Sequence, residues 1–111
     1  MIPGKYCPWI EVSGANAKWC PSCNGKYTKS KTEESNGYPV YIGVHDRLKI
    51  SNNPDNDLWY IESINEKKVF YESFTASDQL EGKYDTDFSI DSIPEIPDEF
   101  LDSYATVKCV Q

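Results

Sequence analysis

Short segments rich in aromatic and β-branched residues follow one another between Asn24 and Phe74, and turn-forming residues separate them at short intervals. This alternation predicts consecutive antiparallel strands, because such side chains fit a pleated, half-buried surface while Gly, Asn and Asp supply the turns. The strongest hairpin signal is Asn36-Gly37, since a type I′ turn needs positive φ at both central positions. Further reversals are expected at Asn24-Gly25, His45-Asp46, Asn52 to Asp57 and Asn65-Glu66.

The pattern predicts an all-β fold in which an antiparallel meander closes into a small barrel or sandwich. Closure would require the last predicted strand to pair with the first. With 111 residues, the chain is expected to form a single domain, residues 1–111, around one hydrophobic core. The expected strands span residues 9–13, 26–31, 39–44, 47–51, 57–63, 69–74 and 105–110.

The pattern breaks down after Phe74. From Ser77 to Pro97 the apolar residues are isolated among Asp, Ser, Gly and Pro, which predicts a long surface loop. Residues 85–102 hold seven acidic residues and no basic residue, so this loop is acidic. Pro97-Asp98-Glu99 suits the first turn of a short helix before the last strand, because proline and acidic residues are favoured there.

The net charge of −7 argues against nucleic-acid binding, because phosphate contacts need clustered Lys and Arg. The charge is unevenly placed, since residues 1–31 hold five lysines and one acidic residue, Glu11. Two interpretations follow: the two ends of the chain complement each other, or residues 85–102 form an acidic face for a cationic partner or for Ca²⁺.

Membrane insertion is not expected, because no segment approaches the roughly 20 apolar residues that a membrane span needs. Met1 to Lys5 lacks the apolar run of a signal peptide. If the protein is secreted, its signal has been removed or the chain is a domain excised from a longer protein.

Four short motifs follow one another in the chain: Trp9 to Ala15, Asn24 to Tyr27, Asn36 to Tyr41 and Leu58 to Ile61. In this order they resemble a small β-rich module that recurs in large, often extracellular or multidomain proteins of protists and invertebrates. The resemblance extends from Trp9 to Cys109. It rests on turn and core residues, so it implies a fold and no activity, ligand or catalytic residue.

The four cysteines, Cys7, Cys20, Cys23 and Cys109, are the best chemical clue. Their even number fits two disulfides, as in small secreted domains that supplement a limited core, although three pairings are possible. Closure of the sheet would bring Cys7 near Cys109 and leave Cys20 and Cys23 as the second pair. An extracellular or cell-surface location follows from this interpretation.

Two other interpretations use the same thiols. A zinc site on all four cysteines has one correct Cys-x-x-Cys pair, Cys20 and Cys23, but lacks the second pair. A thioredoxin-like redox role needs the Cys-Pro-Ser-Cys motif at a helix start, where the helix dipole lowers the thiol pKa, and no helix is predicted after Cys23. Free, inert thiols are the remaining possibility.

Other catalytic or metal-binding signals are sparse. His45 is the one histidine and lies in a predicted tight turn, with no nucleophile paired to it by spacing. The acidic pairs Asp55/Asp57 and Asp85/Asp87 resemble parts of calcium loops, but neither pair is followed by the Gly and distal Glu of an EF-hand loop, which favours turn capping by these side chains over calcium binding. The chain is therefore not expected to be an enzyme, nor to carry a resident cofactor unless zinc or calcium binds as described.

Surface recognition remains the leading hypothesis. Four rings could form an aromatic platform for a sugar or a protein side chain, because they offer a large contact area with a polar group at one end. These candidate ligand-binding residues are Trp19, Tyr38, Tyr41 and Tyr60. The predicted function is a non-enzymatic extracellular module that binds protein or carbohydrate. The alternative is a structural subunit of a larger assembly that docks through the acidic loop, and the oligomeric state stays open.

Overall fold

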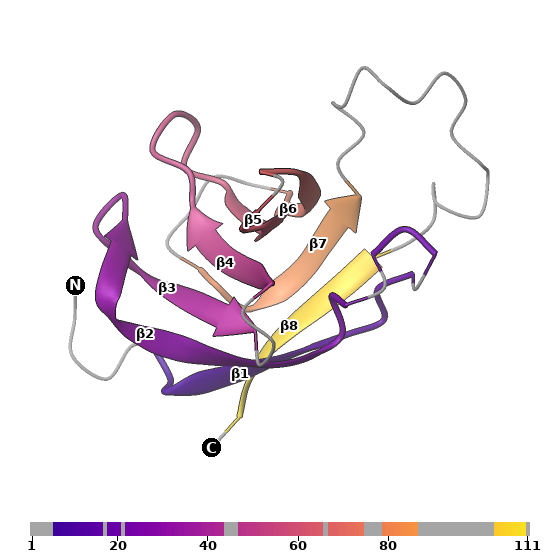
Figure 1. Cartoon of the computed structure of the whole chain (residues 1–111), viewed down its shortest axis with the longest axis horizontal. Helices are drawn as coiled ribbons and strands as arrows, with labels where there is room; N and C mark the ends of the chain where they lie inside the picture. Colours follow the sequence, from indigo (N-terminus) through magenta and orange to yellow (C-terminus); the bar gives the residue numbers. More distant parts are fainter. Residues whose placement is uncertain are drawn as a thin grey trace.

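Eight antiparallel strands, each paired with the next along the chain, form a closed barrel in the computed structural model of the protein (Figure 1). The structure describes residues 6–16, 18–20, 22–43, 47–65, 67–74, 79–86 and 104–110. The strands are β1 (Trp9–Ser13), β2 (Gly25–Ser35), β3 (Tyr38–Gly43), β4 (Leu48–Asn52), β5 (Trp59–Ser63), β6 (Val69–Ser73), β7 (Gly82–Thr86) and β8 (Tyr104–Val110).

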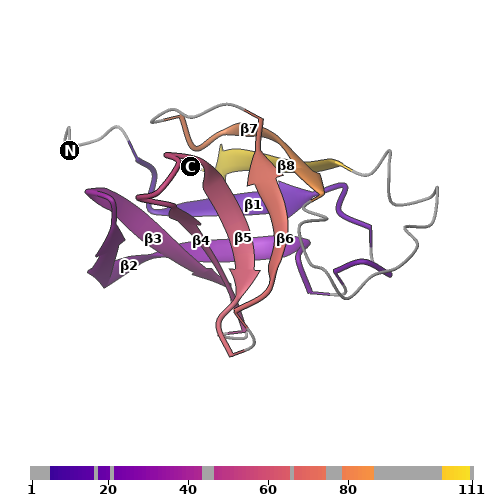
Figure 2. The ribbon, with the colours of Figure 1, turned by 90° about the horizontal axis from the view of Figure 1, so that it is seen from above.

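The barrel closes where β1 pairs with β8. Trp9 is opposite Val110 and Ser13 is opposite Thr106, while the other edge of β1 pairs with β2. The predicted pairing of the first and last strands is confirmed, and the fold is a barrel, which leaves no free sheet edge along the paired strands. In Figures 1 and 2 the β1–β2 connection lies at the opposite end of the barrel from the β2–β3 turn.

The barrel interior is filled by side chains from all eight strands. Alternation along each strand sends every second residue inward, so β1 buries Ile10 and Val12 while Glu11 stays exposed. The largest of the inward side chains are rings, as the aromatic composition predicts, and they form one hydrophobic core. The inward residues of the strands are Ile10, Val12, Tyr27, Tyr41, Leu48, Ile50, Trp59, Ile61, Tyr71, Tyr84, Ala105 and Val107.

Four buried tyrosines connect this core to the chain segments that close the barrel ends. At one end, the hydroxyl of Tyr27 donates to the carbonyl oxygen of Cys23 (2.7 Å), and the backbone N–H of Asn16 donates to the hydroxyl oxygen of Tyr71 (2.9 Å). At the other end, the hydroxyl of Tyr41 donates to the carbonyl oxygen of Cys7, and the hydroxyl of Tyr84 donates to the carbonyl oxygen of Leu80. Each polar group is thus satisfied inside an apolar core.

The Asn36-Gly37 turn has positive φ at both residues, 55° and 80°, as a type I′ turn requires. The side-chain amide of Asn36 donates to the Oδ1 atoms of Asn52 and Asp57, at 2.7 Å each. These bonds join the β2–β3 turn to the β4–β5 turn, which lies at the same end of the meander. The predicted turn is confirmed, and its asparagine also bridges two turns.

Opposite charges face each other across neighbouring strands on the outer surface. Glu11 lies between Lys26 of β2 and Lys108 of β8, and Lys49 of β4 forms an ion pair with Glu62 of β5 (3.4 Å). Cross-strand pairs of this kind stabilise a sheet modestly. Three lysines, Lys26, Lys49 and Lys108, therefore have an acidic residue opposite them on a neighbouring strand.

One predicted loop contains a strand. Residues 82–86 form β7, between β6 and β8, inside the stretch 77–97 that the sequence indicates as a surface loop. The short strand carries Lys83, Tyr84 and Asp85, whose mixture of charge and one ring gives a weak alternating pattern. The predicted helical turn at 97–101 and most of the acidic loop lie outside the described residues. No helix occurs in the described part of the chain, and so none that could cross a membrane.

Candidate functional site

Two large hydrophobic side chains of the described residues are exposed, and they contact each other. Phe74 is 57 % exposed and Tyr104 is 39 % exposed, while the other large rings are buried or half-buried. The ring centroids of Phe74 and Tyr104 are 5.9 Å apart, with the planes tilted by 36°. Single exposed apolar residues are ordinary, whereas two exposed rings in contact form a small apolar patch on the outside of the barrel, which we take as the candidate interaction surface.

Strand pairing explains why these rings meet. Phe74 directly follows β6 and Tyr104 begins β8, so they lie on either side of β7. On β7, Tyr84 points into the core and its neighbours Lys83 and Asp85 point outward. The ammonium group of Lys83 is 5.6 Å from the centroid of the Tyr104 ring, which places a cation beside the aromatic pair.

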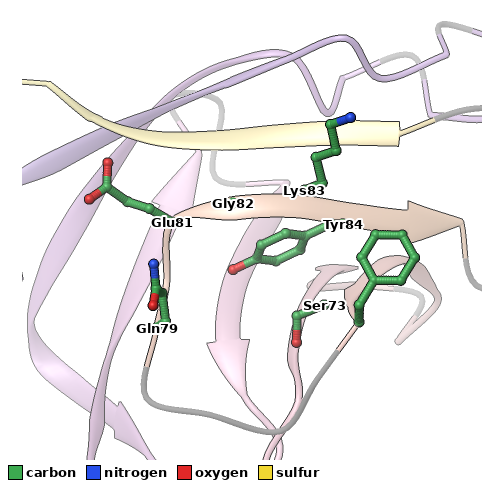
Figure 3. Close-up of a pocket in the computed structure, with 7 residues that line it drawn as sticks. Ser73, Gln79, Glu81, Gly82, Lys83 and Tyr84 are labelled. Atoms are coloured by element: carbon green, nitrogen blue, oxygen red, sulfur yellow. The ribbon is translucent and has the colours of Figure 1, made fainter.

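A groove of about 240 Å³ runs beside the start of β7 and the Phe74 ring, and we name it the recognition groove. Its polar side chains are an amide, a carboxylate, an ammonium and two hydroxyls. Figure 3 shows Lys83 and Tyr84 extending to opposite sides of β7, with Glu81 and Gln79 near the start of the strand. The recognition groove is lined by Ser73, Phe74, Gln79, Glu81, Gly82, Lys83 and Tyr84.

The carboxylate of Glu81 is held in place by the backbone. Its Oε2 accepts the N–H of Cys109 on β8 at 2.9 Å. Gly82 follows with a φ of +141°, a conformation that favours glycine, and a Cβ there would meet nothing within 4 Å. The wall of the groove is therefore open above Gly82, next to a carboxylate of defined position.

The two hydroxyls of the groove already have backbone partners. Ser73 Oγ accepts the N–H of Trp59 (3.0 Å), and the hydroxyl of Tyr84 donates to the carbonyl oxygen of Leu80 (2.6 Å). Burial raises the pKa of Tyr84 well above the usual range of a phenol. The hydroxyls of Ser73 and Tyr84 thus hold the walls of the groove in place, and its charged side chains, Glu81 and Lys83, are the groups that could bind a ligand.

A second hollow, of about 480 Å³, lies where β2 separates from β3. Lys29 pairs with Tyr41 and Glu34 with Pro39, so residues 30–33 bulge out opposite Val40 alone. Two prolines and several charged or hydroxyl side chains line it, without a ring to anchor a ligand. The lining residues are Pro8, Thr28, Lys29, Ser30, Lys31, Glu33, Glu34 and Pro39.

Two of the four rings predicted to bind a ligand are buried. Trp19 is 5 % exposed, packs edge-on against Phe70 with centroids 6.0 Å apart, and donates its indole N–H to the Phe70 carbonyl (2.8 Å). Tyr41 is fully buried in the barrel interior. Because its ring has no exposed surface, Tyr41 supports the core and cannot form part of an exposed platform.

The other two predicted rings lie apart from each other. Tyr38 is partly buried and packs against Tyr6 and Trp59, at centroid distances of 6.1 and 5.4 Å. Tyr60 is half-buried on β5, opposite Ser51 on one side and Glu72 on the other. The structure thus distributes the four predicted rings over the core, both ends of the barrel and strand β5.

Phe74 and Tyr104 were missed as site residues by sequence reasoning. Phe74 ends the predicted strand 69–74, and Tyr104 precedes the predicted strand 105–110. The sequence signal for them is their place at a strand terminus, an odd number of residues from a buried residue. Phe74 is out of phase with Tyr71, and Tyr104 is out of phase with Ala105, so both rings face outward. Their proximity depends on β7, which the sequence does not reveal.

The cysteines form two disulfides, Cys7–Cys109 and Cys20–Cys23. The predicted pairing is confirmed, and the alternatives of a four-cysteine zinc site, a free redox dithiol and inert thiols are wrong for this structure. Cys20 and Cys23 are 1 % and 0 % exposed, so this Cys-x-x-Cys bridge is a structural closure of the β1–β2 connection. Two such disulfides are typical of an oxidising compartment.

The side chains of Asn53 and Asp57 form hydrogen bonds within and to the β4–β5 turn. Asn53 Oδ1 accepts the N–H of Asp55 (2.9 Å), and Asp57 Oδ1 accepts from Asn36. No group of three or more His, Cys, Asp or Glu side chains is placed to hold a metal within the described ranges. His45 and residues 87–103, which include Asp87, lie outside those ranges.

Comparisons of the chain with protein-family models, with curated proteins and with solved structures find no match.

Proposed function

We propose that the protein is a non-enzymatic recognition module that binds carbohydrate or protein outside the cell through Phe74, Tyr104 and the recognition groove. The observation that carries this proposal is the contact between the two exposed rings. Exposing them costs hydrophobic free energy, and a ligand that covers both would recover it. Two disulfides support an extracellular setting.

The rigidity of the support favours binding. Tyr104 belongs to β8, which pairs with both β7 and β1, and Phe74 follows β6 directly. Rings on a paired strand, or directly after one, lose little conformational freedom when a ligand binds, so less of the interaction free energy is lost to ordering. The barrel interior is filled with side chains, so the outer face is the surface on which recognition is expected.

The test compares wild-type protein with the Phe74→Ser/Tyr104→Ser double variant on two panels, an oligosaccharide array and a library of displayed 12-residue peptides. Both substitutions are at exposed positions, so the fold should persist by circular dichroism. We expect binding to at least one panel and its loss in the double variant. Trp9→Ser, which removes a ring from the outer face of β1, is the matched control and should bind normally.

Binding that survives in the double variant would contradict the proposal, as would the absence of binding on both panels. Salt-sensitive self-association without any ligand would instead support a structural subunit that docks through its charged segments.

A further inference from the structure

We infer that the ligand of the recognition groove is a carbohydrate chain, with the apolar faces of its sugar rings on Phe74 and Tyr104 and its hydroxyl groups bonded by Glu81 and Lys83. This inference rests on the proposed function and names the ligand class. Four observations carry it: the closed backbone around β7, the geometry of the ring pair, the chemistry of the groove wall, and the size of the groove.

The backbone around β7 offers no free edge to which a peptide could add as a strand. β7 pairs with β6 through Tyr71↔Thr86, Glu72↔Asp85 and Ser73↔Tyr84, and with β8 from Gly82 to Asp85. An added peptide strand needs a free edge that presents unpaired N–H and C=O groups. Because β7 has strands on both sides, a ligand at this site must be held by side chains, which suits a molecule that carries many hydroxyls.

The two rings make a pair of adjacent, unequal surfaces. Their centroid distance of 5.9 Å is comparable with the length of one sugar unit in a chain, and the 36° tilt prevents one flat ring from covering both. A chain of sugars can follow such a tilt, because each glycosidic linkage turns the next unit. Lys83 beside Tyr104 restrains that ring on the sheet.

The wall of the groove mixes hydrogen-bond donors and acceptors next to the rings. Glu81 is an acceptor, Lys83 is a donor, and the amide of Gln79 is both. A sugar hydroxyl is also both donor and acceptor, so it can pair with a carboxylate such as that of Glu81 or with an ammonium such as that of Lys83. Glu81 is the most defined of them, because the N–H of Cys109 holds one of its oxygens at 2.9 Å and a carboxylate has a second oxygen for a ligand.

The groove is small. Its volume of about 240 Å³ lies below the roughly 300–1,000 Å³ of pockets that enclose drug-sized ligands. A single sugar unit can therefore enter beside Gly82 while the rest of the chain lies across the rings. We assign Glu81 the role of a positioning and specificity residue for that unit.

The experiment is a nuclear magnetic resonance titration of ¹⁵N-labelled protein with linear oligosaccharides of glucose, mannose, galactose and N-acetylglucosamine. We expect at least one series to shift amide signals of residues 73–74, 79–85 and 104–109. Phe74→Ala should weaken that binding about tenfold or more, as a ring at the centre of an interface does. Tyr104→Ala should act in the same way.

Glu81→Gln separates a positioning role from a structural one. The Gln side chain can still accept the N–H of Cys109, so thermal stability should stay unchanged, while loss of the charge-assisted bond weakens binding about tenfold. Glu11→Gln, an exposed change on β1, is the matched control and should leave the affinity as in wild type. Equal affinities of Glu81→Gln and wild type would overturn the role of Glu81.

The outcomes distinguish this inference from the proposed function. If no oligosaccharide series shifts these signals but a displayed peptide binds and needs Phe74 and Tyr104, the carbohydrate inference is wrong and the recognition proposal stands. If shifts occur at residues 28–34 around the second hollow instead, both are wrong. Shifts at the groove that Phe74→Ala abolishes support both.

Discussion

The hydroxyl of Tyr41 donates a 2.6 Å hydrogen bond to the carbonyl oxygen of Cys7, 34 residues earlier in the chain. Cys7 precedes β1 and Tyr41 lies on β3, so the bond connects the core to the segment that covers one barrel end. Tyr84 bonds the carbonyl of Leu80 at the same end, and Tyr27 bonds Cys23 at the other. Rings from the core thereby hold the closing segments through their hydroxyls.

Tyr41→Phe should lower the free energy of unfolding by about 1–3 kcal/mol, because the buried carbonyl of Cys7 loses its partner while the ring still fills the core. Urea denaturation followed by tryptophan fluorescence measures the change. Tyr104→Phe is the control and should change the stability by less than about 0.5 kcal/mol, since Tyr104 is exposed. Equal stabilities of Tyr41→Phe and wild type would show that water replaces the lost bond.

Stability should fall steeply at alkaline pH. Burial, with smaller contributions from Tyr6 and Glu81, raises the pKa of Tyr41 to about 12, and burial also raises the pKa of Tyr27 and of Tyr84. An unfolded tyrosine titrates near pH 10. The stabilising contribution is therefore complete below about pH 10 and is lost as the pH rises toward the raised values.

Each of these three groups should contribute a slope of about 1.4 kcal/mol per pH unit in that window. Denaturant midpoints between pH 9 and 12 test this, on a time scale short enough to keep the disulfides intact. The Tyr27→Phe variant should show a shallower slope than wild type. A slope identical to that of wild type would indicate that Tyr27 ionises in the folded protein as it does in the unfolded chain.

The two disulfides should differ in their contribution to stability. Cys7–Cys109 closes a loop with a sequence separation of 102, and Cys20–Cys23 one with a separation of 3. Chain-entropy estimates give about 4.7 kcal/mol for a loop of 100 residues and about 2 kcal/mol for a very short one. The Cys7→Ser/Cys109→Ser variant should therefore unfold at clearly lower urea concentrations than Cys20→Ser/Cys23→Ser.

The two disulfides should also differ in how fast they are reduced, because they differ in exposure. Cys109 is half-buried, whereas Cys20 and Cys23 are fully buried, so dithiothreitol should open Cys7–Cys109 first in the folded protein. Alkylation and mass spectrometry at intervals identify which thiols appear. Early labelling of Cys20 and Cys23 would contradict the expected order.

Asn36→Ala should destabilise the protein by about 1–3 kcal/mol, because it removes two hydrogen bonds to the β4–β5 turn and places alanine at a φ of 55°. Asn36→Gly keeps the turn conformation and loses only the bonds, so the difference between the two variants measures the backbone cost. Asn36→Asp should be less stable than Asn36→Gly at pH 7, because its carboxylate would face that of Asp57. Thermal unfolding checks all three, and equal melting temperatures for Asp and Gly would refute the charge argument.

Local signals predict much of the barrel. The strands that contain Tyr27, Tyr41 and Tyr60 carry β-branched and aromatic residues between turn residues, and the Asn36-Gly37 turn has the expected geometry. β7, Gly82 to Thr86, is not predicted because Tyr84 is its one large apolar side chain, and a single ring among glycine and polar residues gives too weak an alternation to distinguish a strand from a loop. It becomes a strand because β6 and β8 both offer it hydrogen-bonding partners.

The exposure of individual rings could not be predicted for a different reason. Alternation tells which residues share a face of a strand, but it does not tell which face turns inward when the sheet closes. Tyr41 was therefore expected at the surface and is buried, while Phe74 and Tyr104 were not considered and are exposed.

The sequence by itself determines the all-β meander and the turn at Asn36-Gly37, because strand propensity and a preference for positive φ are local properties. It leaves three cysteine pairings possible, and closure of the barrel selects Cys7–Cys109 and Cys20–Cys23. The tertiary structure alone decides which rings are buried, that β7 completes the sheet, and that Phe74 meets Tyr104. Those features depend on contacts between residues distant in the chain, and such contacts form only when all eight strands close around one core.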